Sequence, residues 1–479
     1  MSTQTPREGA RDSAAKTPAQ TPAQTSTQTP AQTPARPPKE AATEMPAQTL
    51  AQPVTLPCGA VIANRIAKSA TSEGLAAGSN HANGYHAALY GRWGASGAGM
   101  IITGNVMVDR AHLERGGNIA IEGEPPDAAR AALAQMAEAA KSGGAHVIMQ
   151  LNHAGRQTPA AINPAPKSAS PVPLAVGGKM FARPEAMEAE EIEDVIEAFV
   201  HAALVARGAG FDGVQIHAAH GYLVSQFLSP LSNRRSDAWG GGLMGRARLL
   251  MELVRRVRSA CGVRFIVGVK LNSADFQRGG FSEDDSAQVG AWLEGAGADF
   301  IELSGGNYEQ PRMMDIDRLD PLAATPKRES TKAREAYFLD FVPRLRKVTN
   351  LPIMVTGGFE TAAAMQAAVK EEDIDFIGLA RPMLVDPDAP LGLLSGETEA
   401  LPPRPKLQLG RGFFGPLSAY SPIRDANAAA AQAWYFEQIY ALASGEAPRR
   451  DLKPWKALLA YLKTEKKAVQ ALAARPRDL

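Results

Sequence analysis

Short apolar runs alternate with longer amphipathic segments over most of the chain. Segments with apolar residues at every third or fourth position, such as residues 191–210 (EIEDVIEAFVHAALVARGAG), are typical of helices, and this one ends in glycine as many helices do. Between such segments lie eight runs that are typical of strands: RIAKSAT, GMIITGN, HVIMQLNH, GVQIHAAH, FIVGVKLN, FIELSGG, PIMVTGG and FIGLARP. Eight strand–helix repeats predict an α/β fold, a (β/α)8 TIM barrel, with its active site at the C-terminal ends of the strands.

Polar residues recur on one face of three of these runs. Neighbouring side chains of a strand point to opposite faces, so Gln150, His217 and Lys270 each oppose aliphatic neighbours in HVIMQLN, GVQIH and FIVGVKLN. If the aliphatic faces pack against the helices, all three polar side chains point into the mouth of the barrel. One polar residue at a strand end is as often structural as functional, but three from separate strands favour a shared site.

Three regions of different composition divide the chain. Residues 1–50 repeat Thr, Pro, Ala and Gln with few large apolar residues, which predicts a disordered tail. Residues 51–400 contain the strand–helix repeats. Residues 401–479 contain two amphipathic segments, which predict a C-terminal helical extension without chemistry of its own, packed on the barrel or on a second subunit. Two connections, residues 155–184 and 305–330, are longer than a barrel needs and are predicted to form lids or substrate walls.

Composition excludes several classes of protein. The chain has 479 residues, 45% of them hydrophobic, and a net charge of +1, which offers no electrostatic field for nucleic acid or anionic membranes. Cys58 and Cys261 are its two cysteines, too few for a disulfide framework or a cysteine-ligated metal cluster. No apolar stretch approaches the length of a membrane span. We therefore expect a soluble, cytoplasmic protein that binds small molecules, and a homo-oligomer is possible.

Glycines and an arginine near the end of the barrel predict a phosphate site. VTGGFE places Gly357 and Gly358 after the seventh strand, and LARP places Arg381 after the eighth. Glycine lets backbone N–H groups approach a phosphate closely, and arginine adds a fixed fork of charged donors. TIM barrels often bind phosphate at these two loops. A phosphorylated ligand is therefore favoured.

The stretch QIHAAHGYLVSQFLSP, residues 215–230, adds His217, His220 and Tyr222 to the same end of the barrel. Beside them, the Gln150 carboxamide suits a ligand edge that carries N–H next to C=O, and the charge of Lys270 suits a ligand that becomes an anion. FMN combines a phosphate, such an imide edge and an anionic reduced form. These residues therefore favour FMN as the cofactor.

Longer motifs between residue 54 and about residue 400 resemble a known family. They are NRIAKSATSEG, GMIITGN, MQLNHAGRQ, FDGVQIHAAHGYLVSQFLSPLSNRRSDAWGG, VGVKLNSADF, GGF and LARPMLVDP. Through them the chain resembles the Old Yellow Enzyme family of FMN-dependent ene-reductases, particularly its bacterial NADH:flavin oxidoreductase branch. The fourth motif is the most specific, because it joins the histidine pair, the tyrosine and an NxRxDxWGG element at fixed spacing.

The resemblance implies an enzyme that passes hydride from NADH or NADPH through FMN to the β-carbon of an activated alkene or enone. The residues implied to contact FMN are Ala70, Thr71, Ser72, Asn105, Gln150, Lys270, Gly357, Gly358, Ala380 and Arg381. His217 and His220, expected to be mostly neutral near pH 7, would donate hydrogen bonds to a carbonyl or nitro oxygen of the substrate. Tyr222 would supply a proton to the α-carbon.

Four positions depart from the pattern of the family. Lys270 stands where many relatives have arginine, so its contact is a point charge and not a fork. Ala70 replaces a common proline, and Ser72 replaces a threonine or cysteine, changes that can alter the flavin potential. Trp239 replaces a tyrosine at what we interpret as a structural position.

Other functions fit parts of the same pattern. Lys270 could form a Schiff base in an aldolase-type barrel, although that leaves Gln150 and the histidines without a role. His217 and His220 could bind a metal, although no carboxylate accompanies them in the motif. A barrel that binds FMN without turnover, as a sensor or scaffold, is a third reading. Within flavin chemistry, a dehydrogenase or an oxidative demethylase stays open.

Overall fold

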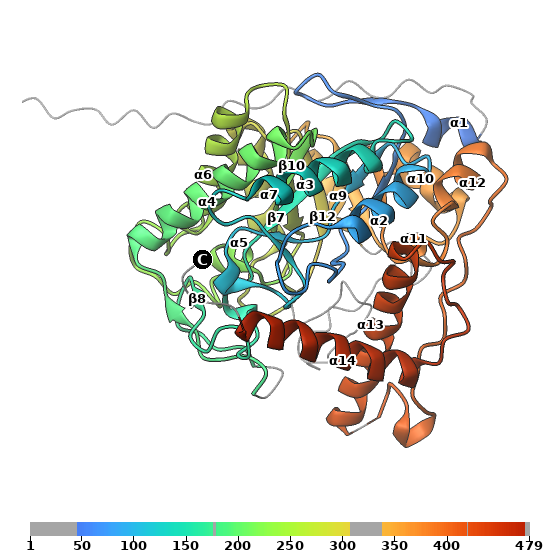
Figure 1. The fold of residues 1–479 in the computed structure, drawn as a ribbon. Helices are drawn as coiled ribbons and strands as arrows, with labels where there is room; N and C mark the ends of the chain where they lie inside the picture. The colour runs from blue at the N-terminus through green and yellow to red at the C-terminus, as the bar shows by residue number, and fades with distance from the viewer. Residues whose placement is uncertain (1–45, 176–178, 307–337, 419, 475–479) are drawn as a thin grey trace, which may run out of the picture. The chain divides into compact units, whose positions relative to one another are not determined.

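Eight parallel strands close into a barrel. The computed structural model describes residues 46–175, 179–306, 338–418 and 420–474 (Figure 1). The barrel strands pair in the order β10, β11, β12, β13, β14, β3, β4 and β7, and pairing of β7 with β10 completes the ring. Their bounds are β3 Ile66–Lys68, β4 Met100–Ile102, β7 His146–Asn152, β10 Gly213–Ala218, β11 Ile266–Asn272, β12 Phe300–Ser304, β13 Ile353–Thr356 and β14 Phe376–Leu379. All eight lie within the predicted runs, so the TIM-barrel prediction is confirmed.

Helices surround the barrel strands (Figure 1). Short additional strands lie outside the ring of eight barrel strands. The helices up to the last barrel strand are α1 Pro46–Ala51, α2 Gly84–Gly94, α3 Asp127–Ala140, α4 Ala189–Gly208, α5 Leu223–Leu228, α6 Leu243–Cys261, α7 Glu283–Ala296, α9 Val342–Arg346 and α10 Ala362–Glu371. The helices after it are α11 Pro382–Val385, α12 Ala389–Ser395, α13 Ser421–Ala443 and α14 Pro454–Ala473. The short strands are β1 Val54–Thr55, β2 Val61–Ile62, β5 Val106–Met107, β6 Ile119–Ala120, β8 Lys167–Ser168 and β9 Glu185–Ala186. The 3-10 turns are η1 Arg110–His112, η2 Gly155–Gln157, η4 Leu339–Phe341 and η5 Gly412–Phe414.

Local signals in the sequence explain where the barrel helices begin and end. At the start of α7, the Ser282 hydroxyl accepts a hydrogen bond from the Asp285 amide, and the Asp285 carboxylate accepts one from the Ser282 amide. Gly297 ends the helix in the left-handed conformation that favours glycine. In α4, Ile192, Ile196 and Phe199 repeat on one buried face, which packs the helix against the barrel.

The barrel interior is apolar at one end and polar at the other. The apolar layer consists of Ala67, Met100, Ile102, Ile148, Ile266, Phe300, Met354 and Phe376. Because side chains alternate along a strand, the residues two or four positions further along share the interior face. Gln150, Lys270 and Glu302 occupy this second layer. The strand pattern thus fills one end of the barrel interior with apolar side chains and places hydrogen-bonding side chains at the C-terminal end.

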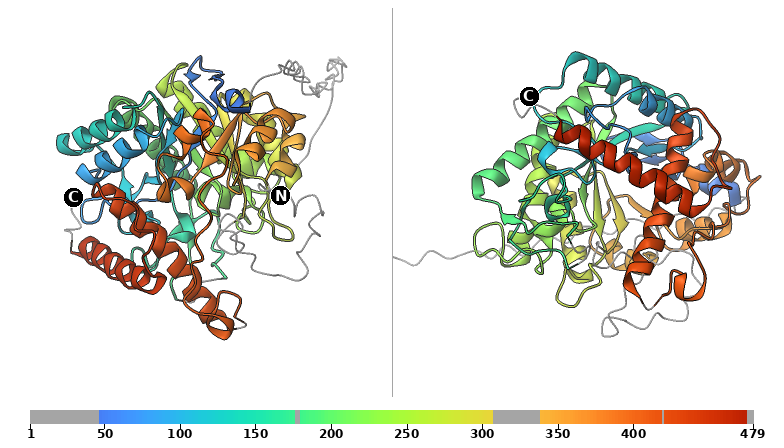
Figure 2. Two further views of the ribbon diagram at one scale, coloured as in Figure 1. Left: turned by 90° about the vertical axis from the view of Figure 1, so that its right-hand side faces the viewer. Right: turned by 60° about the horizontal axis from the view of Figure 1, so that its bottom comes forward.

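The two ends of the chain extend the barrel. Residues 1–45 of the predicted tail lie outside the described residues, and α1 begins at Pro46, within the last residues of the predicted tail. Leu50 is fully buried in the main core, and α1 contacts α10 and α12. The predicted C-terminal extension is present as α13 and α14, which lie side by side (Figure 2). Within the described residues, no helix is both long and apolar enough to cross a membrane.

Candidate active site

A buried hydrogen-bonded chain connects four barrel strands, β7, β10, β11 and β12. Gln150 Nε2 donates to Gln215 Oε1 at 2.6 Å, and Gln215 Nε2 donates to Glu302 Oε2 at 2.8 Å. Lys270 Nζ donates to the other oxygen of Glu302 at 2.9 Å. The register places His217 beside Lys270 and Lys270 beside Glu302. The predicted convergence of Gln150, His217 and Lys270 on the barrel interior is therefore confirmed.

Glu302 is the centre of this network, and the sequence analysis missed it. Its side chain is fully buried and also accepts a hydrogen bond from the Thr356 hydroxyl at 2.7 Å. Burial alone would raise the pKa of Glu302, but the charge and hydrogen bond of Lys270 lower it. The run FIELSGG carried the signal, since Glu302 lies two positions after the inward Phe300. A carboxylate that the sequence analysis did not include therefore compensates the charge of Lys270.

The histidine pair and the tyrosine meet as predicted. The His217 ring lies edge-on to the His220 and Tyr222 rings, with centroids 5.0 Å and 4.8 Å away. The Ala219 amide donates to His217 Nδ1 at 3.2 Å, so a neutral His217 carries its proton on Nε2. Burial and the neighbouring positive charges hold the pKa of both histidines well below its usual range. Both histidine rings are therefore neutral, as expected from the sequence.

The two histidines differ in how their nitrogens are used. His220 adopts a left-handed backbone conformation, with φ of +62°, and its amide donates to Asn272 Oδ1 at 3.2 Å. Its Nε2 lies 2.6 Å from the Ser304 hydroxyl. His217 has no such partner at Nε2 among the described residues. Of the two, His217 is thus the better placed to offer an N–H group to a bound molecule.

A cavity at the C-terminal ends of the strands contains part of the predicted cofactor site. Seven of the predicted residues line it: Ala70, His220, Lys270, Gly357, Gly358, Ala380 and Arg381. Gly357 and Gly358 have φ of +96° and +88°, which explains the glycine pair. Lys270 and Arg381 both line the cavity, and two cationic donors in one cavity fit a ligand with anionic groups. These features fit FMN, whose phosphate would lie at Gly357, Gly358 and Arg381.

The other predicted residues do not line this cavity. They are Thr71, Ser72, Asn105, Gln150, His217 and Tyr222. The Ser72 hydroxyl and Asn105 Nδ2 both donate a hydrogen bond to Glu114, at 2.7 Å and 3.0 Å. The sequence analysis missed this shared carboxylate acceptor. Within the described part of the chain, Asn105 Oδ1 is buried without a hydrogen-bond partner, as are both amide atoms of Asn152. Unpartnered polar atoms beside a barrel mouth fit a site that completes its hydrogen bonds with a ligand.

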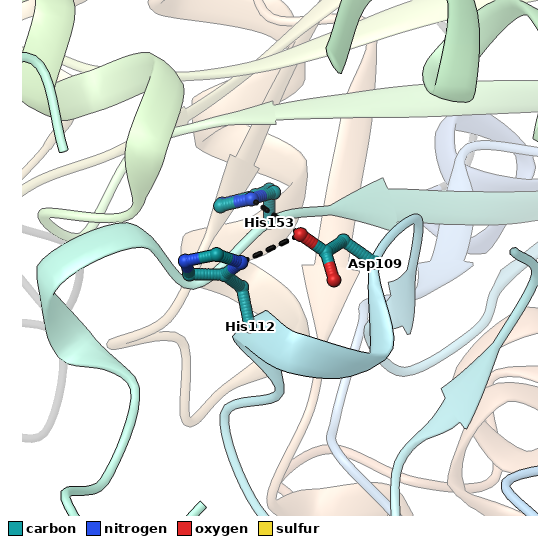
Figure 3. Close-up of side chains that lie close together, drawn as sticks. All are labelled: Asp109, His112 and His153. Atoms are coloured by element: carbon teal, nitrogen blue, oxygen red, sulfur yellow. Dashed lines mark hydrogen bonds and ion pairs between the residues drawn. The ribbon is translucent and has the colours of Figure 1, made fainter. Parts of the chain in front are cut away.

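The long connections are only partly described. Most of the predicted wall at residues 305–330 lies outside the described residues. In the other connection, β8 pairs with β9, and the Lys167 amide donates to His112 Nε2 at 2.8 Å. This contact ties the connection to a cluster of Asp109, His112 and His153 near the start of α5 (Figure 3).

The Asp109 cluster has the spacing of a metal site but the wrong protonation. Asp109 Oδ2 lies 2.6 Å from His112 Nδ1 and 3.4 Å from His153 Nε2 (Figure 3). Backbone amides of Lys167 and Gly155 donate to the far nitrogens of the two rings. A neutral ring whose far nitrogen accepts a hydrogen bond carries its proton on the near nitrogen, where a metal would need a lone pair. Asp109 is therefore hydrogen-bonded to His112, while His153 Nε2 lies 3.4 Å from it without a hydrogen-bond partner among the described residues. Among the described residues, this metal-like spacing does not occur at His217 and His220.

The C-terminal extension supplies residues that the sequence analysis missed. Tyr435 of α13 lines the cavity, together with Leu401, Pro402, Arg404 and Pro405. Tyr435 thus lies beside the predicted cofactor site, while the expectation that the extension has no chemistry of its own stays a prediction. No local pattern predicts this position, because it joins α13 to strand ends far away in the sequence.

Comparisons with known proteins agree with this site. Residues 49–397 match the family described as "NADH:flavin oxidoreductase / NADH oxidase family". Two relatives named "NADH-dependent flavin oxidoreductase iliE" are each 36% identical over 71% of this chain. The alignment covers 87% of the protein from Hypocrea jecorina and 46% of the protein from Neonectria sp., so this chain spans about half of the latter. The old yellow enzyme homologue from Zymomonas mobilis superposes with a TM-score of 0.61 at 25% identity, over 74% of this chain and 94% of that one.

These comparisons settle the predicted family, and they do not distinguish its branches, so the bacterial branch stays a prediction. The predicted oxidoreductase class and the predicted cofactors, FMN with NADH or NADPH, are confirmed at the level of the family. The chain belongs to the NADH:flavin oxidoreductase / NADH oxidase family, to which the Old Yellow Enzymes also belong.

Proposed function

We propose that this protein is an FMN-dependent NAD(P)H oxidoreductase that reduces an activated alkene, such as an enone. The observation that carries the proposal is the joint position of Lys270, Arg381 and the glycine pair in one cavity, with His220 in its wall. When bound there, FMN supplies hydride transfer from NADH or NADPH to the substrate. The whole of the predicted site belongs to the proposal, including Thr71, Ser72, Asn105 and Gln150 as further contacts with FMN.

The protein's own groups have separate tasks in this function. Arg381 and the amides after β13 would hold the phosphate, while Glu302 holds the Lys270 ammonium where it would donate a hydrogen bond to the flavin. His217 Nε2–H polarises the substrate oxygen and stabilises the negative charge that develops on it. Tyr222, buried against His217, holds the proton that the α-carbon receives.

The Schiff-base alternative is less well supported. A nucleophilic lysine needs a free amine, whereas Lys270 donates a charge-assisted hydrogen bond to a fully buried carboxylate. The partner, location and assembly of the protein follow from the proposed function as expectations: small-molecule substrates, the cytoplasm, and a subunit count that gel filtration can measure.

The test separates the two halves of the reaction. Protein purified in the dark should be yellow, and NADH or NADPH should bleach it without oxygen. Mixing the bleached Tyr222→Phe variant with 2-cyclohexenone should show reoxidation slowed about 100-fold, with bleaching nearly unchanged. Tyr85→Phe, a change on the exposed face of α2, is the matched control. Colourless protein that does not take up FMN disproves the function; equal slowing of both halves disproves the role of Tyr222.

A further inference from the structure

The cavity wall comes from two parts of the chain. One part lies at the strand ends within residues 49–397, which match the family, and includes Gly357, Gly358 and Arg381. The other part consists of Leu401, Pro402, Arg404, Pro405 and Tyr435. All five follow residue 397, where the match to the family ends. The residues that match the family therefore do not include this side of the cavity.

Tyr435 is held firmly although it comes from the extension. Its neighbour Trp434 is buried, and Trp434 Nε1 donates to the Leu452 carbonyl at 2.9 Å. Tyr435 packs against the cluster of Val385, Ala433, Trp434 and Ala457. Val385 also lines the cavity, so this cluster joins α13 directly to the phosphate loop after β14. A wall residue held in this way loses little freedom when a ligand binds.

The helix pair is anchored to the barrel at a second point. Arg115, from the connection between β5 and β6, is buried, with its guanidinium carbon 3.7 Å from the centre of the Phe436 ring and 5.2 Å from that of Tyr461. It also donates to Glu465 of α14 and to the Tyr440 hydroxyl. A charge this deeply packed between α13 and α14 fixes both helices beside the mouth of the barrel.

Tyr435 lies beside Arg381 in the wall of the cavity. Its ring centre is 6.0 Å from the guanidinium carbon of Arg381. An aromatic ring at this distance lies beside any anionic group that the arginine binds. Resting on the proposed FMN function, we infer that α13 completes the cofactor site, and that Tyr435 contacts the phosphate end of FMN and retains it.

The experiment measures cofactor affinity and not turnover. Flavin-free protein is titrated with FMN and, separately, with riboflavin, which lacks the phosphate, and quenching of flavin fluorescence gives Kd. Tyr435→Ala should weaken FMN binding about tenfold or more, the loss expected for a contact with a charged group. Riboflavin binding should change much less. Tyr85→Ala, on the exposed face of α2, is the matched control, and circular dichroism checks that each variant is folded.

Tyr435→Phe extends the test, because it removes the hydroxyl but keeps the ring and so leaves no new cavity. If the hydroxyl bonds the phosphate, the phenylalanine variant loses affinity like the alanine variant; if the ring makes the contact, it keeps affinity. Either result supports the inference. Unchanged FMN affinity in Tyr435→Ala overturns it, and so does an unchanged affinity with a raised KM for the alkene, which would make Tyr435 a substrate wall. A wild-type protein that binds neither flavin refutes the proposed function instead.

Discussion

Two lysines of the barrel are buried on opposite sides of its wall. Lys270 of β11 points into the barrel, where its Nζ lies 2.9 Å from the carboxylate of Glu302. Lys68 of β3 points outward, with its Nζ 3.9 Å from the centre of the Trp93 ring on α2. Lys68 donates to the Thr71 hydroxyl at 2.7 Å, and among the described residues no carboxylate lies within ion-pair distance of it. The same side chain thus has a compensated charge inside the barrel and an uncompensated one outside.

The surroundings of the two lysines explain why only one of the two charges is compensated. Burial lowers the pKa of Lys68 to about 7, although the charge of Glu73 opposes this shift. Glu73 is itself buried, with a raised pKa, and accepts hydrogen bonds from Tyr90 and from the Gly104 amide. Inside the barrel, Glu302 keeps a lowered pKa because of Lys270. A directly paired carboxylate, more than burial, decides whether a buried charge persists.

Removal of one partner of the inner pair should have the largest effect. Lys270→Met leaves Glu302 buried with a charge and no cation, which should lower the free energy of unfolding by about 3–5 kcal/mol. Urea unfolding of the flavin-free protein measures this without any contribution from the cofactor.

The double variant Lys270→Met/Glu302→Gln sharpens the result. It removes the stranded charge, so it should recover much of the lost stability. If the single and double variants are equally unstable, lost packing and not the unpaired carboxylate explains the effect, and the contrast with Lys68 fails.

The outer lysine, Lys68, should make the stability of the protein depend on pH. Above the folded pKa of about 7, Lys68 is neutral in the folded protein but still protonated in the unfolded chain, whose pKa is near 10.5. The unfolded state then binds more protons, so stability rises with pH in this window. The stability of the wild type relative to Lys68→Met should therefore increase by about 2 kcal/mol between about pH 8 and about pH 9.5.

Urea unfolding of both proteins across this range measures the slope. Lys466→Met on α14 serves as the control, because the Lys466 side chain is exposed in the folded protein. Parallel stability curves for the wild type and Lys68→Met would show that Lys68 keeps its proton in the folded protein, and the contrast between the two lysines would then fail.

The sequence predicts the inner lysine better than the outer one. Alternation along a strand is local, so it placed Lys270 and Gln150 on the interior face, and the same rule applied to FIELSGG would have found Glu302. Lys68 lies on the outward face of its strand, where its environment depends on how α2 brings Trp93 over it. Tyr435 depends likewise on the packing of α13. The sequence predicts the environment of a residue when neighbours on the same strand determine it. It does not predict that environment when the packing of a distant helix determines it.

An exposed pair should have the smallest effect and complete the comparison. Arg92 and Asp388 form two hydrogen bonds of 2.7 Å and 2.6 Å, a geometry as good as that of the inner pair. Their side chains are 36% and 56% exposed, so water already compensates each charge. A double-mutant cycle with Arg92→Ala and Asp388→Ala should give a coupling of at most about 1 kcal/mol, which shrinks further in salt. A coupling as large as that between Lys270 and Glu302 would mean that geometry, and not burial, sets the strength of these pairs.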